Sequence, residues 1–238
     1  MHRFACINHR IPRLVPVLLD GMVYSEDDQF LLQNEQEDDS NVPDQEQDLE
    51  PIHYKSSKGN DDDDDDQEEF DDYSEWNLRK CSAAALDYLS EIYHSELLTV
   101  LIPLIQQKMQ TATKWAVVES IILALGAIAK GCYRSMCQYL PDLMPFLFQQ
   151  MKHPQVLVRS ITCWSISRYS LWITNQEPKQ YLEPLLAALC TLMLDRNKSI
   201  QQAACTALTH LQESTRVNLI AYIQPIVETF MKAFPLYQ

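Results

Sequence analysis

The sequence predicts an all-α protein built as a repeating array of helix pairs. Three observations lead to this fold class. Only 4 of the 238 residues are glycine, so few turns with positive φ are available and strand hairpins are disfavoured. Apolar residues recur at helical spacing from Trp76 to the end of the chain. Blocks of sequence also return at a fixed interval.

The repeat interval identifies the kind of array. LIPLIQQKM at 101–109 returns 42 residues later as LMPFLFQQM at 143–151, and YLPDL at Tyr139 returns as YLEPL at Tyr181. A period near 42 residues with two amphipathic helices in each unit is typical of HEAT or armadillo repeats. Such units bury their apolar faces only by stacking, so we expect a superhelical HEAT-repeat solenoid.

The predicted elements follow one another in three zones. Residues 1–25 contain IPRLVPVLLDGM, the first helix of a partial repeat. Residues 26–75 form an acidic loop inserted in the same repeat, and residues 76–238 form about four HEAT repeats. The second helices of the pairs, which would line the concave face, are expected at 76–93, 114–131, 155–172 and 197–213.

The acidic loop carries most of the charge of the chain. From Glu26 to Glu75 there are 22 acidic residues and two lysines, a net charge of −20. Because the whole chain carries −14, the remainder carries +6. A stretch this polar cannot bury enough apolar surface to offset its ordering entropy, so we expect it to be disordered. Its densest part comprises Asp61, Asp62, Asp63, Asp64, Asp65, Asp66, Glu68 and Glu69.

Several function classes are disfavoured by the residue types present. The seven cysteines form no CxxC pair and mostly sit in apolar helical patterns, which predicts reduced thiols and no zinc site. The chain has no apolar run of membrane-spanning length and no secretory signal pattern. It contains no glycine-rich phosphate loop, no HExxH and no GxSxG. We therefore expect a binding protein with no cofactor and no metal, not an enzyme.

Several blocks of sequence resemble a known family. The chain is similar to the transportins, the karyopherin-β2 type of nuclear import receptor in the importin-β superfamily, from about Ile11 onward. The resemblance implies a central piece of a long HEAT-repeat superhelix. The blocks that carry it are YSEWNLRKCSAAALD (73–87), ALGAIAKGC (124–132), QYLPDLMPFL (138–147), VRSITCWSISRYS (158–170) and DRNKSIQQAACTAL (195–208).

The resemblance implies a function and a set of partners. Receptors of this family bind cargo proteins, many of them RNA-binding, through proline-tyrosine nuclear localisation signals on the concave face. They also bind Ran-GTP and nucleoporins, and the acidic loop couples Ran-GTP binding to cargo release. We expect no direct nucleic-acid or membrane partner, and a location in cytoplasm and nucleus. The implied cargo-signal residues are Ala84, Asp87, Leu123, Ile161, Trp164, Arg168 and Glu213.

The spacing of the implied site residues is consistent with that role. Ile161, Trp164 and Arg168 are spaced i, i+3, i+7 on one helical stripe. A proline-tyrosine segment has little backbone freedom to lose, and its rings could pack on Trp164. Arg168 could hold the tyrosine region, while Asp87 and Glu213 could pair with basic residues of the signal. Without the resemblance, Trp164 would be interpreted as core, and Arg168 and Asp87 as solvated charges.

Two other classes of function remain open at this point. One is a HEAT-repeat scaffold, such as a phosphatase regulatory subunit, and the other is an acidic histone chaperone. A scaffold needs no groove lined by Trp164 and Arg168, whereas a chaperone would depend on the acidic loop. The resemblance covers only part of a transportin, so we expect weak cargo binding and no Ran coupling from this chain alone.

Overall fold

The computed structural model describes residues 10–32, 77–214 and 219–233, and in these ranges every regular element is a helix. The predicted all-α fold class is therefore confirmed. Most of the predicted acidic loop, with Asp61 to Asp66, Glu68 and Glu69, lies outside the described residues. The helices are α2 (Ile11–Gly21), α3 (Glu26–Leu31), α5 (Leu78–Thr111), α6 (Trp115–Ala127), α7 (Tyr133–Met136), α8 (Leu140–Gln150), α9 (Val156–Ser167), α10 (Ser170–Thr174), α11 (Leu182–Leu192), α12 (Lys198–Ser214), the 3-10 turn η2 (Leu219–Tyr222) and α13 (Ile223–Ala233).

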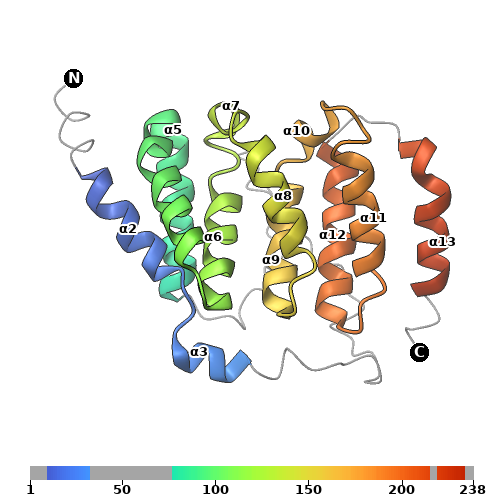
Figure 1. The fold of residues 1–238 in the computed structure, drawn as a ribbon, viewed down its shortest axis with the longest axis horizontal. Helices are drawn as coiled ribbons and strands as arrows, with labels where there is room; N and C mark the ends of the chain where they lie inside the picture. Colours follow the sequence, from blue (N-terminus) through green and yellow to red (C-terminus); the bar gives the residue numbers. More distant parts are fainter. Residues whose placement is uncertain (1–9, 33–76, 215–218, 234–238) are drawn as a thin grey trace, which may run out of the picture.

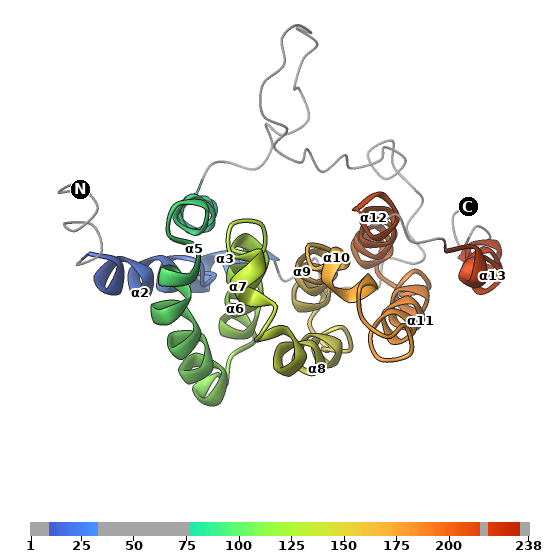
Figure 2. The same cartoon turned by 90° about the horizontal axis from the view of Figure 1, so that it is seen from above.

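The helices form two rows, as a HEAT solenoid requires. The first half of α5, then α6, α9 and α12, lie along one side, and the second half of α5, α8 and α11 lie along the other (Figures 1 and 2). Helix α2 packs against α5, α8 against α9, and α11 against α12. Helix α9 also contacts both α6 and α12, so the row of second helices forms a continuous surface. The four predicted second-helix positions are confirmed to within a few residues, except that the third is divided into α9 and α10.

Helix α5 is two helices joined at His94. This residue has φ 42° and ψ −114°, a conformation that side chains with a Cβ rarely adopt. Its ring Nδ1 lies 2.7 Å from the carbonyl oxygen of Gly131, and the Cys132 thiol lies 3.2 Å from the His94 carbonyl oxygen. These contacts hold the kink. His94 therefore separates two helices that follow one another without a loop.

The beginning of the predicted disordered loop is helical, which corrects the expected boundary. Residues 26–31 form α3, which Ser25 caps in a reciprocal capping box with Asp28. The Ser25 side chain accepts from the Asp28 N–H at 3.1 Å, and the Asp28 carboxylate accepts from the Ser25 N–H at 3.1 Å. Three acidic residues in the first turn also suit the positive end of the helix dipole. Acidic composition alone therefore did not locate the end of ordered structure.

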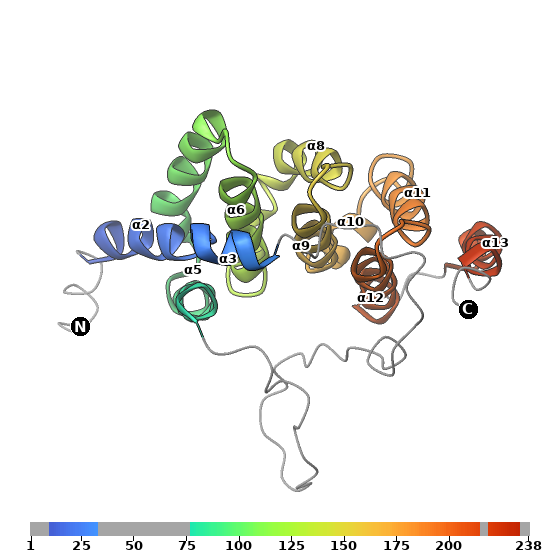
Figure 3. The ribbon, with the colours of Figure 1, turned by 90° about the horizontal axis from the view of Figure 1, so that it is seen from below.

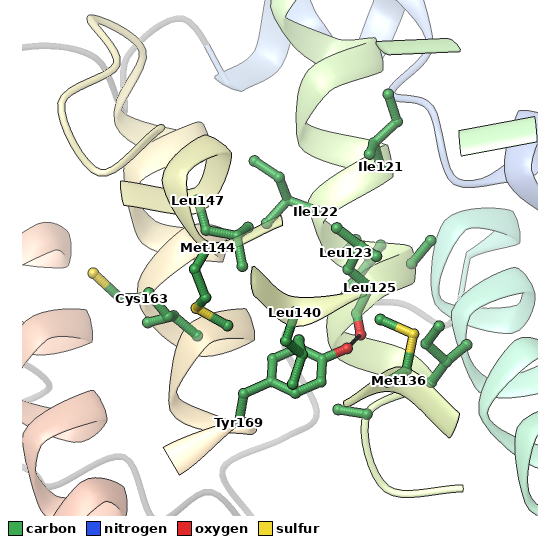
Figure 4. Close-up of a cluster of buried hydrophobic side chains, with 14 of the residues drawn as sticks. Ile121, Ile122, Leu123, Leu125, Met136, Leu140, Met144, Leu147, Cys163 and Tyr169 are labelled. Carbon is green, nitrogen blue, oxygen red and sulfur yellow. Dashed lines mark hydrogen bonds between the residues drawn. The ribbon is translucent and has the colours of Figure 1, made fainter. Parts of the chain in front are cut away.

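The core runs continuously through the array, and α6 lies at its centre. This helix is apolar on nearly all sides because α5 and α9 cover it from opposite directions. Two hydroxyl groups of the α9–α10 region fix the register. Ser165 donates to the Ile122 carbonyl oxygen at 2.7 Å. Tyr169 donates to the Leu125 carbonyl oxygen at 2.6 Å (Figure 4). Tyr169 is fully buried, and this burial raises the pKa of its hydroxyl.

The helices show no membrane-spanning character. In the part of the chain that the structure describes, none of them combines the length and the apolar composition needed to cross a bilayer.

Candidate functional site

The structure places the seven expected site residues on four neighbouring helices of one row. Ala84 and Asp87 lie on the first half of α5, Leu123 on α6, Ile161 and Trp164 on α9, Arg168 at the C-cap of α9, and Glu213 at the end of α12. These helices lie side by side along the same side of the array (Figures 2 and 3). Most of the seven side chains are half-buried, whereas Glu213 is exposed.

The Trp164 ring packs against the backbone of α6. It packs so closely against Gly126 that a methyl group there would overlap the ring carbons. Gly126 is a site residue that sequence reasoning missed. The available signal was a glycine inside an otherwise strongly apolar helix, in the run ALGAIAKG, where glycine usually has a packing reason. The ring packs against the core and is still half-buried, not fully enclosed.

Arg168 lies beside this ring with spare hydrogen-bonding capacity. Its guanidinium carbon is 5.2 Å from the centroid of the Trp164 ring, a cation–π arrangement. The C-terminal end of α9, where Arg168 is the cap residue, also favours a positive charge. The Arg168 Nε atom is buried and has no hydrogen-bond partner among the described residues.

Asp87 supplies the complementary negative charge from α5. Partial burial raises the pKa of its carboxyl, and nearby Glu91 raises it further, while Arg168 and Lys130 lower it. Lys130 is already paired with Glu91 at 2.8 Å. No direct ion pair joins Asp87 to Arg168, both of which lie in described helices, and the buried Asp87 Oδ1 has no hydrogen-bond partner. Two opposite charges therefore face the same region without neutralising each other directly.

The remaining expected residues contribute to different degrees. Ile161 and Ala84 are half-buried apolar side chains. Leu123 belongs to the core and exposes only 7% of its surface, so it supports the site from beneath. Glu213 lies beyond the buried Leu211, two residues further along α12. The structure therefore joins Trp164, Arg168 and Asp87 most closely, with Leu123 below them and Glu213 at the edge.

The chemistry of this surface suits binding. An aromatic face, a guanidinium with an unused N–H and a carboxylate with an unused oxygen can hold an extended peptide by packing and hydrogen bonding. Burial raises the pKa of Cys132 and of Cys163 to about 12, so these thiols are poor nucleophiles. Within residues 10–32, 77–214 and 219–233, no group of three His, Cys, Asp or Glu side chains could hold a metal ion.

Comparison with known proteins agrees with this architecture. A model of the HEAT-like repeat matches residues 115–169. Transportin-1 of Homo sapiens and transportin-1 of Mus musculus are each 45% identical over 239 residues, which cover 96% of this chain and 26% of those proteins. Importin subunit beta-2 of Schizosaccharomyces pombe is 40% identical over 257 residues, which cover 96% of this chain and 28% of that protein.

The match is extensive for this chain but partial for its relatives. The chain spans about a quarter of the length of the curated relatives it matches. The identity extends over nearly the whole chain and therefore includes the helices that carry the candidate site. The chain is thus homologous to a HEAT-repeat portion of the transportin and importin beta-2 proteins.

Proposed function

We propose that this chain is a segment of a nuclear import receptor and binds proline-tyrosine nuclear localisation signals of cargo proteins. The binding surface is the row formed by α5, α6, α9 and α12. The observation that carries the proposal is the half-buried Trp164 ring, stacked by Arg168 and flanked by Asp87. The homology to transportins directs the choice of ligand.

Each side chain has a distinct part in this mode of binding. The proline and tyrosine rings of the signal pack on Trp164 and Ile161, both of which are partly open to solvent. The Arg168 guanidinium, which lies beside the Trp164 ring, donates to a peptide carbonyl or to the tyrosine hydroxyl. The unpaired Asp87 Oδ1 accepts from a basic side chain or from that hydroxyl. Glu213 extends the acidic contribution along the row toward basic residues of the signal.

The buried polar atoms explain why a ligand would bind with specificity. A buried Arg N–H and a buried carboxylate oxygen without partners each cost free energy in the unbound protein. A peptide that supplies both partners recovers this cost. A peptide that only fills the apolar part of the surface does not. The proline-tyrosine signal is of the first kind because it combines rings with nearby polar and basic groups.

The acidic loop has a separate proposed role. With a net charge of −20 beside a remainder of +6, the segment from Glu26 to Glu75 can compete with basic cargo for its own receptor. In the intact receptor this competition would couple Ran-GTP binding to cargo release. Passage between cytoplasm and nucleus would then depend on nucleoporins. Deletion of residues 33–72 in a full-length receptor should leave peptide binding intact and abolish Ran-dependent release; unchanged release would exclude this role.

Fluorescence polarisation with a labelled proline-tyrosine signal peptide tests the binding proposal. We expect Trp164→Ala and Arg168→Ala to weaken binding tenfold or more, a loss of at least ~1.4 kcal/mol. Arg134→Ala is the matched control because Arg134 is an exposed arginine on α7, outside the site. The same peptide with both ring residues replaced by alanine is the ligand control.

Two outcomes of this experiment contradict the proposal. If the parent chain is helical by circular dichroism and does not bind the peptide, this chain lacks the activity. Equal binding by the parent and by both site variants would place the peptide elsewhere on the array. In the first case, the binding measurement is repeated with basic partners such as histones, which the acidic segment could hold.

A further inference from the structure

A second polar cluster lies at the other end of the same helices. It comprises Arg79 in the first turn of α5, Glu119 and Trp115 in α6, and Tyr24, which precedes α3. Helix α3 lies beyond the ends of α5 and α6 (Figures 1 and 3). The cluster therefore joins the connection between α2 and α3 to the beginnings of α5 and α6.

The four side chains form a closed circuit of contacts. Arg79 Nη2 makes an ion pair with Glu119 Oε1. The guanidinium carbon of Arg79 lies 4.2 Å from the centroid of the Tyr24 ring. The Tyr24 ring in turn lies 5.9 Å from the Trp115 ring at a tilt of 44°. Trp115 and Glu119 are one turn apart on α6, so both ends of the circuit close on the same helix.

The residues on either side of the circuit are fixed by local structure. The carbonyl oxygen of Tyr24 accepts a hydrogen bond from Gln29 Nε2 at 2.9 Å, which ties the α2–α3 connection to α3. On the other side, Asn77 caps α5, with its side chain accepting from the Lys80 N–H at 2.9 Å. Arg79 and Tyr24 therefore meet as parts of two ordered helix starts.

Burial of Glu119 shows that this contact is more than a surface ion pair. Glu119 is only 1% exposed, and its Oε2 atom has no hydrogen-bond partner among the described residues. A buried carboxylate is costly, and an apolar residue would pack between α5 and α9 without that cost. The carboxylate fixes the position of the Arg79 guanidinium. An apolar side chain could not do this.

We propose that Arg79, held by Glu119 and stacked on Tyr24, is a clasp that fixes the connection between α2 and α3 to the beginning of α5 and to α6. Tyr24 and Arg79 are 55 positions apart in the sequence; packing of α2 on α5 brings the two regions together, and the clasp adds a polar and aromatic contact at the end of that interface. The clasp fixes the position from which α3 begins relative to the first turns of α5 and α6. This proposal concerns described residues only and does not depend on peptide binding by the candidate site.

The position of the clasp connects it to the candidate site. Asp87 lies eight residues after Arg79 on α5, and Leu123 lies four residues after Glu119 on α6. The same two helices therefore carry the clasp at their beginnings and the site further along. A change in the clasp therefore acts on the same two helices that carry Asp87 and Leu123.

Hydrogen exchange of the full chain, followed by mass spectrometry, tests the clasp. In Tyr24→Leu and Arg79→Lys we expect amides of residues 25–32 and 77–82 to exchange at least tenfold faster than in the wild type. Both variants avoid leaving Glu119 without a countercharge. Amides of α9 and α12 should be unaffected. Lys108→Ala is the matched control because it removes an ion pair to Asp20 that joins the same helices α2 and α5 on the exposed surface.

Three results would overturn the clasp. The first is unchanged exchange at residues 25–32 in both variants. The second is faster exchange of equal size throughout α6 to α12, which would mean a general loss of stability. The third is an effect of Lys108→Ala on residues 25–32 as large as that of Tyr24→Leu. None of these readouts involves the signal peptide, so failure of the clasp and failure of the proposed function are distinguishable.

Discussion

Arg79 and Arg159 each join one helix pair to the next through a carboxylate, but their surroundings differ. Arg159 donates through Nη1 to the carbonyl oxygens of His153 and Pro154 at 2.8 and 3.0 Å, and through Nη2 to Asp195 Oδ1 at 3.1 Å. Asp195 lies in a turn, with 19% of its side chain exposed. Arg79 pairs with Glu119 inside α6, where only 2% of the carboxylate side chain is exposed.

The difference shows how burial changes the contribution of an arginine–carboxylate pair to stability. Arg159 also donates to two backbone carbonyl oxygens, and Asp195 also accepts from the Asn197 N–H, so neither side chain of this pair depends on the other alone. The Glu119 carboxylate has only Arg79 to offset its loss of water, and one of its oxygens has no partner. The first pair is expected to contribute modestly to stability. The second makes the junction between α5 and α6 sensitive to any change in charge.

Removal of Arg79 should have the largest effect. At pH 8, above the pKa of about 7 that burial gives the Glu119 carboxyl, Arg79→Ala removes the countercharge of a buried carboxylate, and we expect a loss of about 3–5 kcal/mol in the free energy of unfolding. Urea unfolding followed by circular dichroism measures this loss. The double variant with Glu119→Gln should recover much of it, because the uncompensated charge is then absent. A loss below about 1 kcal/mol in the single variant would show that the pair is solvated.

The next effect is a dependence of stability on pH. Burial raises the pKa of the Glu119 carboxyl from 4.5 to about 7, although Arg79 acts in the opposite direction. The folded protein therefore retains a proton that the unfolded chain loses above pH 4.5. The resulting stability is fully present below pH 4.5 and is lost as the pH rises through 7, by about 3 kcal/mol in total.

A comparison with Glu119→Gln isolates this dependence from that of other groups. Relative to the variant, the wild type should become less stable as the pH is raised from 5 to 8 in urea unfolding experiments. The Gln side chain can still accept from Arg79, so the variant keeps the hydrogen bond and loses only the titration. A difference that stays constant or increases with pH would mean that Glu119 is ionised throughout this range.

Arg159→Ala should destabilise less than Arg79→Ala. It removes three hydrogen bonds, but His153 and Asp195 lie in turns where water can replace the guanidinium. We expect a loss of about 1–2 kcal/mol, measured under the same urea conditions. If this substitution costs as much as Arg79→Ala, degree of burial does not distinguish the two pairs.

The smallest effect should come from the exposed pair between α2 and α5. Lys108 Nζ lies 2.7 Å from Asp20 Oδ1, and the Asp20 side chain is 71% exposed. Lys108→Ala should change stability by less than about 1 kcal/mol, and added salt should reduce even that difference. Thermal unfolding at low and high salt measures both quantities. A larger, salt-independent loss would indicate that Lys108 contributes mainly through packing of its aliphatic chain.

The helices could be predicted from sequence because their signals are local. The 42-residue repeat and the apolar spacing located the beginnings of α6, α9 and α12 to within a residue or so. The break between α9 and α10 at Arg168 and Tyr169 was not predicted, since the apolar pattern continues across it. The helical start of the acidic loop was missed as well, because local capping by Ser25 outweighed the acidic composition.

The candidate site was predictable only in part. The stripe of Ile161, Trp164 and Arg168 follows from helical periodicity, and the resemblance to transportins indicated its use. Contacts between helices could not be predicted from the periodicity or from the resemblance. How α5, α6 and α9 stack decides two contacts of the site. One is the packing of the Trp164 ring against Gly126, and the other is the electrostatic interaction between Asp87 and Arg168.

The sequence by itself determined the helical periodicity, the repeat length and the segregation of negative charge into one segment. These properties depend on neighbouring residues and on composition, which any single chain displays directly. Only the tertiary structure decided that Glu119, a single acidic residue in the run WAVVESIILALG, is buried and paired with Arg79. The physical reason is that α6 lies between α5 and α9, so the face that carries Glu119 is turned away from water and the carboxylate pairs with Arg79 across a helix junction.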